Sequence, residues 1–224
     1  MFSPRLGRLV VLALALAACS KEKPSADEKE DPGPAVKLAP KAGAFDEARL
    51  KALARIDVPG FKRTSDEANR MAAQPVYHGE QRSAKGYHAV VQVNVMGCED
   101  CAAPTLAEFQ QELPQRRDMM LPALHQQNPK LVYEAFGIDL PGGKQAHAIF
   151  TLSHVKQEQS SGSAHGLDVF FTTGAAKLYI QVWPRPEVPG TSVASQEELA
   201  ATFSRDDLVA IAKQFLAVFL KALP

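Results

Sequence analysis

The sequence has no excess of charge of either sign. Its 224 residues include 25 lysines and arginines and 25 aspartates and glutamates, so the formal net charge is zero. Proteins that attract nucleic acid or anionic lipid electrostatically carry a clear positive excess. The composition therefore excludes this class of function for the chain as a whole, and we expect no nucleic acid among its partners.

The sequence also lacks an apolar run long enough to cross a membrane. The longest run, Leu9 to Ala18, has about ten residues and makes a helix of about 15 Å, whereas a transmembrane helix needs about 20 residues. Arg5 and Arg8 precede it, and a positive segment followed by a short apolar segment is typical of a signal peptide. We predict a signal peptide over residues 1–18.

The apolar run ends at Leu16-Ala17-Ala18-Cys19, which resembles the lipobox of bacterial lipoproteins. The resemblance implies cleavage before Cys19 and acyl chains, such as palmitate, on its thiol and on the new N-terminus. It also implies the outer membrane, because Ser20 follows the cysteine where inner-membrane lipoproteins have Asp. Two or more acyl chains make a stable anchor, at about 0.8 kcal/mol per buried CH₂. We expect a lipid-anchored protein of the cell envelope that faces the periplasm.

Residues 19–44 have few large apolar side chains, many charges and several prolines. Such a segment buries too little apolar surface to offset the entropy of ordering. We predict a lipidated, disordered tether over 19–44, followed by a single globular domain over 45–224.

Motifs of common enzymes are missing. There is no GxSxG, P-loop, GxGxxG or HExxH pattern, and each of these marks a defined chemistry. The histidines are scattered and predict no zinc site; we expect them on the surface or in loops: His78, His88, His125, His147, His154 and His165. The absence of a catalytic pattern predicts a binding or assembly-accessory domain rather than an enzyme, with no cofactor.

Cysteine is rare, and its odd count of three needs an explanation in an exported protein. If Cys19 carries lipid, Cys98 and Cys101 remain as a pair. An oxidising envelope compartment permits these two residues to form a disulfide. We expect this disulfide to pin the turn between a strand and a helix.

Two other functions for the cysteine pair stay open. Met96-Gly97-Cys98-Glu99-Asp100-Cys101 is similar to the metal loop of heavy-metal-associated domains, which implies copper held by Cys98 and Cys101. Thioredoxin-like proteins also place CxxC between a strand and a helix, which implies thiol–disulfide exchange. Glu99 and Asp100 oppose that function because nearby negative charge disfavours the thiolate.

Hydrophobic periodicity predicts the elements of the domain. Residues 87–95 alternate as a strand, and Thr105 with Glu108 matches a capping box that opens a helix over 105–127. Residues 61–86 read as irregular, apart from a short edge strand near Val76-Tyr77, and 157–164 reads as a Ser/Gly-rich loop. The other expected elements are a helix over 45–55, hairpins 131–140/145–154 and 167–173/177–183, and two C-terminal helices capped by Ser195 with Glu198 and by Ser204 with Asp207.

This order predicts an α+β domain with a mainly antiparallel sheet and helices packed on it. Over about 55–223 it resembles the PsbP-like α/β/α sandwich family. The resemblance rests on Val58-Pro59-Gly60-Phe61 entering a strand region, the helix at 105–127, the two hairpins and the C-terminal helix. It implies an assembly factor or binding scaffold with an envelope protein as partner.

Overall fold

The structure is a computed structural model that describes residues 45–82, 86–98, 101–112, 132–157, 160–186 and 196–223. Several predictions lie outside these residues: the signal peptide 1–18, Cys19, the tether 19–44, the helix beyond 112, His125 and the Ser195 cap. The side chains of 153–164, which include His154, also lie outside the description. Within the described part of the chain, no helix is long and apolar enough to span a bilayer.

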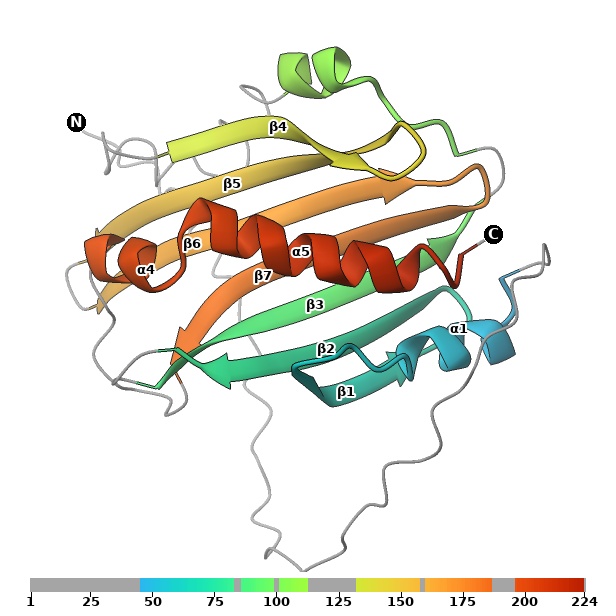
Figure 1. The fold of residues 1–224 in the computed structure, drawn as a ribbon, viewed down its shortest axis with the longest axis horizontal. Helices are drawn as coiled ribbons and strands as arrows, with labels where there is room; N and C mark the ends of the chain where they lie inside the picture. The colour runs from blue at the N-terminus through green and yellow to red at the C-terminus, as the bar shows by residue number, and fades with distance from the viewer. Residues whose placement is uncertain are drawn as a thin grey trace, which may run out of the picture. The chain divides into compact units, whose positions relative to one another are not determined.

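Seven strands form one antiparallel sheet in the order β1-β2-β3-β7-β6-β5-β4 (Figure 1). Two meanders, β1 to β3 and β4 to β7, meet where β3 pairs with β7. The predicted α+β class with an antiparallel sheet is therefore confirmed. The strands are β1 Phe61–Ala68, β2 Ala72–Gln81, β3 Tyr87–Gly97, β4 Val132–Leu140, β5 Lys144–Gln157, β6 Ser160–Thr172 and β7 Ala176–Pro186.

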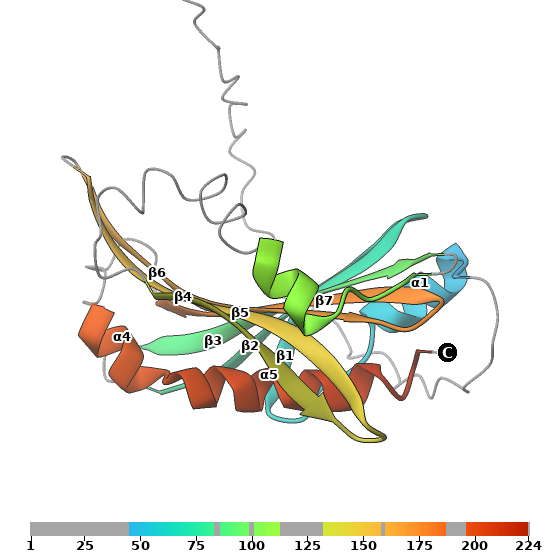
Figure 2. The same ribbon diagram turned by 90° about the horizontal axis from the view of Figure 1, so that it is seen from above.

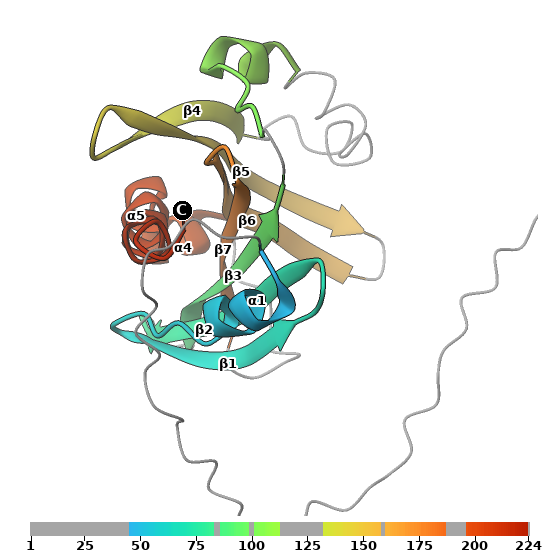
Figure 3. The ribbon, with the colours of Figure 1, turned by 90° about the vertical axis from the view of Figure 1, so that its right-hand side faces the viewer.

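The C-terminal helices α4 (Gln196–Thr202) and α5 (Arg205–Phe219) lie against one face of the sheet, which curves around α5 (Figures 1 and 3). We call this face the helix face. Its apolar side chains interleave with the predicted apolar stripe of α5 and exclude water from the main core. The stripe residues that are buried there are Leu208, Ile211, Ala212, Phe215, Phe219 and Ala222.

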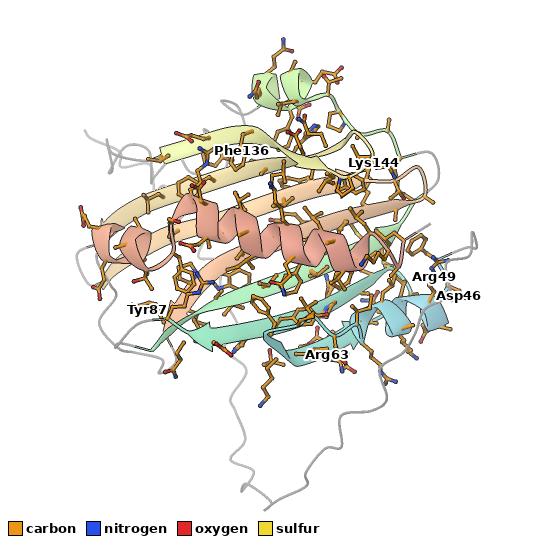
Figure 4. The ribbon with its side chains drawn as sticks, in the orientation of Figure 1. Asp46, Arg49, Arg63, Tyr87, Phe136 and Lys144 are labelled. Carbon is orange, nitrogen blue, oxygen red and sulfur yellow. A yellow bond between two sulfur atoms is a disulfide. The ribbon has the colours of Figure 1, made fainter. Side chains whose placement is uncertain are left out.

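Helix α1 (Glu47–Ala54) closes one end of the same core with Leu50 and Leu53. Asp46 caps α1 by accepting a hydrogen bond from the Arg49 amide at 2.7 Å. The Arg49 guanidinium, labelled in Figure 4, donates to the Ala222 carbonyl oxygen at 3.2 Å. The segment that precedes the sheet is thereby tied to the end of the chain.

The opposite side of the sheet, which we call the outer face, carries a helix over 106–112. Figure 2 shows α5 and this helix on opposite sides of the sheet. The predicted capping box is confirmed: the Glu108 amide donates to Thr105 Oγ1 at 3.2 Å, and the Thr105 amide donates to Glu108 Oε2 at 2.8 Å. Ser204 and Asp207 form the second predicted box at the start of α5. These bonds satisfy amides that a helix start leaves unpaired.

Two predictions about irregular segments are wrong. Residues 61–86 contain the strands β1 and β2, and the expected loop 157–164 includes the ends of β5 and β6, where Gln157 lies opposite Ser160. β1 is an edge strand with many exposed polar side chains, so its apolar signal is weak. The Ser/Gly-rich part of β6 pairs through its backbone, which leaves no hydrophobic alternation to read.

Candidate binding site on the outer face

Polar and aromatic side chains gather on the outer face where β3, β7, β6 and β5 lie side by side. The register places Gln92 opposite Gln181, and Gln181 opposite Asp168. A second row runs parallel to the first, because residues two apart on a strand share a face. It joins Asn94, Tyr179, Phe170 and His147. We call these seven residues, Gln92, Asn94, His147, Asp168, Phe170, Tyr179 and Gln181, the outer-face cluster.

Asp168 is the only carboxylate of the cluster, and two neighbours on β7 hold it in place. The Tyr179 hydroxyl donates to Asp168 Oδ1 at 2.6 Å, and Gln181 Nε2 donates to the same oxygen at 3.0 Å. Burial and the hydrogen bond to Asp168 raise the pKa of Tyr179 far above its ordinary value. The phenol therefore remains a hydrogen-bond donor at physiological pH, and Asp168 Oδ2 takes no part in these two bonds.

Aromatic rings flank this carboxylate. Phe170 stacks on Tyr179 with ring centroids 4.8 Å apart, and Phe109 of the helix 106–112 packs against Phe170 and His147 at 5.5 and 5.3 Å. Burial lowers the pKa of His147, so its ring is neutral at pH 7. The cluster therefore combines flat apolar rings with one negative charge.

Asn94 contributes an unused hydrogen-bonding group. Its Oδ1 is buried and makes no hydrogen bond in the described structure, which is unusual because most buried polar atoms are paired. The side chains of Gln92, Asp168 and Gln181 beside it are half-buried. The cluster thus presents amide and carboxylate groups that are positioned by the sheet.

The Tyr179 hydroxyl is held as a neutral donor to the Asp168 carboxylate. The described residues also contain no group of three or more His, Cys, Asp or Glu side chains able to hold a metal ion. Hydrogen bonding and stacking are what these residues offer.

Cys98 and Cys101 lie away from the cluster, at the end of β3. Their Cα atoms are 5.9 Å apart and their sulfurs are at disulfide distance. The Cys98 and Cys101 amides donate to the carbonyl oxygens of Ala175 and Gly174, at 3.0 and 3.2 Å. The following helix begins at residue 106. Because a helix dipole acts only within about one turn, it gives the Cys98 thiol little of the activation seen in thioredoxin-like sites.

The histidines differ from the expectation of surface or loop positions. His88, His147 and His165 are buried. His165 lies on the helix face, where its Nε2 is 2.6 Å from the Phe203 carbonyl oxygen, and burial lowers its pKa. The prediction failed because each of these side chains alternates with apolar residues in a strand, and single-strand periodicity does not show what covers either face.

The outer-face cluster was not predicted from the sequence. Asp168 and Phe170 alternate with buried Val169, and Tyr179 and Gln181 alternate with buried Ile180, so period two alone places each pair on one face. That these faces adjoin Asn94 depends on the β3–β7 pairing, which joins residues 85 positions apart, as in Asn94 with Tyr179. Comparison of the chain with protein-family models, curated proteins and solved structures finds no match.

Proposed function

We propose that this protein is a lipid-anchored lipoprotein of the bacterial envelope whose domain binds a partner through the outer-face cluster and catalyses no reaction. The observation that carries the proposal is the Asp168 carboxylate, which Tyr179 and Gln181 hold beside the unpaired Asn94 oxygen. Positioned acceptors of this kind favour binding because little entropy is lost in ordering them.

The chemistry of the cluster defines the kind of partner. Asp168 and Asn94 offer acceptors and Gln92 offers an amide, while Phe170 and Tyr179 offer ring surface. A polypeptide can satisfy the cluster, because its backbone N–H groups donate hydrogen bonds to the acceptors and an apolar side chain can lie on the rings. We therefore propose an envelope protein as the partner, bound through hydrogen bonds to the Asp168 carboxylate and the Asn94 and Gln92 amides and through contact with the two rings.

The PsbP-like α/β/α sandwich remains our proposal for the finer fold. It is supported by helices on both sides of the antiparallel sheet, α5 on the helix face and 106–112 on the outer face (Figure 2). In this arrangement one face supplies the core and the other supplies the binding surface. That division suits a scaffold or assembly factor.

Site-specific photocrosslinking in intact cells tests the binding site. A photoreactive residue at Gln92 should trap a defined partner, whereas the same residue at Lys213, exposed on α5, should not. Asp168→Asn keeps the shape of the side chain but removes its charge, and it should weaken the Gln92 adduct about tenfold, the usual effect of losing a charged acceptor. Equal adducts at the two positions, or an adduct unchanged by Asp168→Asn, would contradict the proposal.

The anchor is tested separately. The apolar run and Leu16-Ala17-Ala18-Cys19 support lipidation at Cys19, at the outer membrane and facing the periplasm. Cys19→Ala should move the protein from the membrane fraction to the soluble periplasm and abolish labelling by radioactive palmitate. A Cys19→Ala protein that stays on the membrane would disprove the anchor without affecting the binding site.

For Cys98 and Cys101 we propose a structural disulfide. Their backbone bonds to the β6–β7 turn and the five-residue distance from Cys101 to the helix at 106 support this function over copper binding or thiol exchange. Thiol counting after alkylation of envelope fractions should find both residues oxidised. Stoichiometric Cu(I) that is lost in Cys98→Ser would instead establish the copper carrier.

A further inference from the structure

Four basic side chains form a continuous row on the outer face, apart from the outer-face cluster. Lys62 lies directly opposite His78 across β1 and β2, and His88 lies directly opposite Arg185 across β3 and β7. The rings of His78 and His88 join the two pairs, with centroids 4.8 Å apart. Tyr87, labelled in Figure 4, is buried in the core of the helix face, so the next side chain, His88, points outward.

The row is electrostatically unbalanced. Among the described residues, no carboxylate forms an ion pair with any of its four members. Burial, followed by His88, Arg185 and Lys62, lowers the pKa of His78. A chain with no net charge nevertheless places Lys62 and Arg185 at the two ends of this row, where a bound group of opposite charge would pair with both.

His88 supplies a second, independent observation. Its side chain is 7% exposed, and its Nε2 is buried without a hydrogen-bond partner. A buried polar atom of this kind costs stability unless something pairs with it. The His88 ring lies next to the His78 ring and directly opposite Arg185 on β7, so this unpaired nitrogen belongs to the same row.

The neighbours of the histidine pair decide what that group is. Two imidazoles alone would suit a transition metal. Lys62 and Arg185 lie on either side, however, and their positive charge repels a metal cation. Both side chains donate charge-assisted hydrogen bonds to phosphate oxygens. The row crosses four strands, or about 14 Å at the usual strand spacing, which is enough for more than one phosphate group.

We propose that Lys62, His78, His88 and Arg185 form a binding site for a phosphate-bearing ligand. Lys62 and Arg185 supply the positive charge at the two ends of the site. The two imidazoles, which lie between Lys62 and Arg185, donate hydrogen bonds to the phosphate oxygens. The site is separate from the outer-face cluster and does not depend on the proposed function. The ligand can be a soluble phosphoryl compound or the phosphate of a lipid headgroup, and the chemistry of recognition is the same.

Inorganic pyrophosphate is the probe for calorimetry with the full chain carrying Cys19→Ala. The double variant Lys62→Gln/Arg185→Gln should weaken binding about tenfold or more, because each lost contact is charge-assisted. The control Lys144→Gln/Lys177→Gln makes the same change in net charge at exposed lysines elsewhere, and it should bind as the parent does. Equal weakening of pyrophosphate binding in both double variants would show that the loss follows from the net charge of the protein and not from this site. That result would overturn the proposal.

His88→Phe should change thermal stability and pyrophosphate binding in opposite directions. The ring and its packing are kept, while the unpaired Nε2 is removed, so the melting temperature should rise as pyrophosphate binding falls. A higher melting temperature also shows that the variant is folded. Unchanged binding in a folded His88→Phe protein would overturn the site.

Vesicles distinguish the two sources of phosphate. Flotation with vesicles of phosphatidylcholine alone and of phosphatidylcholine with phosphatidylglycerol shows whether the row takes an anionic lipid. Pyrophosphate binding without flotation indicates a soluble ligand, and flotation that Lys62→Gln/Arg185→Gln abolishes indicates a lipid. The absence of both, or flotation that this double variant does not change, disproves the proposal.

Discussion

The two faces of the sheet are built in different ways. The helix face buries Tyr77, Ile180 and Phe215 completely. The outer face keeps Asp168, Tyr179 and Gln181 half-buried, and it leaves Asn94 Oδ1 and His88 Nε2 buried without partners. Because one face supplies most of the hydrophobic stabilisation, the other is free to carry groups that serve binding at some cost to stability.

The largest effect should come from the same substitution made on both faces. Phe215 is fully buried and packs edge-on against Phe61 and Tyr77, with centroids 4.9 and 5.0 Å away. Phe215→Ala should lower the free energy of unfolding by about 3–5 kcal/mol, because it leaves a cavity in the core.

Phe170→Ala, on the outer face, should cost only about 1–2 kcal/mol, mainly the stacking on Tyr179. Urea unfolding followed by circular dichroism measures both variants. Equal losses would show that the outer face is as much a structural core as the helix face.

The next effect is a loss of stability in acid. Burial lowers the pKa of His165 on the helix face and of His147 and His78 on the outer face. The unfolded chain then binds more protons than the folded one as pH falls through about 6.5. The contribution of these neutral histidines to the free energy of unfolding is therefore fully present above about pH 6.5 and declines as the pH falls below it.

His165→Gln retains a donor for the Phe203 carbonyl oxygen but does not titrate. Its stability should fall less than that of the wild type between pH 7.5 and 5, as urea midpoints at each pH would show. His147→Gln is the outer-face counterpart and should also flatten the curve. A His165→Gln curve parallel to the wild type would mean that the helix face takes no part in the acid response.

A smaller effect is expected from the two capping boxes. Ser204→Ala removes the cap of α5, and since α5 covers the helix face, global stability should fall by about 1 kcal/mol. Thr105→Ala removes the matching cap on the outer face. Hydrogen exchange should show local opening of 106–112 with the global free energy almost unchanged. A full global loss in Thr105→Ala would show that this helix is part of the main folding unit.

The sequence predicted the helix face far better than the outer face. The α5 stripe, the strand 87–95 and the Ser204 capping box are local patterns, and each is confirmed. The Thr105 capping box on the outer face is confirmed too, because it is equally local. Asp168 and Asn94 belong to one cluster only because β3 pairs with β7, and no local pattern encodes that pairing. Net charge was equally uninformative about the row from Lys62 to Arg185, because a balance over the whole chain does not describe four neighbouring strands.

The smallest effect on stability should come from Asn94→Val. The substitution removes the unpaired buried Oδ1 and introduces a residue that favours strands. The free energy of unfolding should stay the same or rise by up to about 1 kcal/mol, since an unsatisfied acceptor is lost. Gln92→Val, two residues away on the same face, has no such buried atom and serves as the control. A fall of several kcal/mol in the free energy of unfolding of Asn94→Val would show that Asn94 is a structural residue. The contrast between the two faces would then not hold at the centre of the proposed binding site.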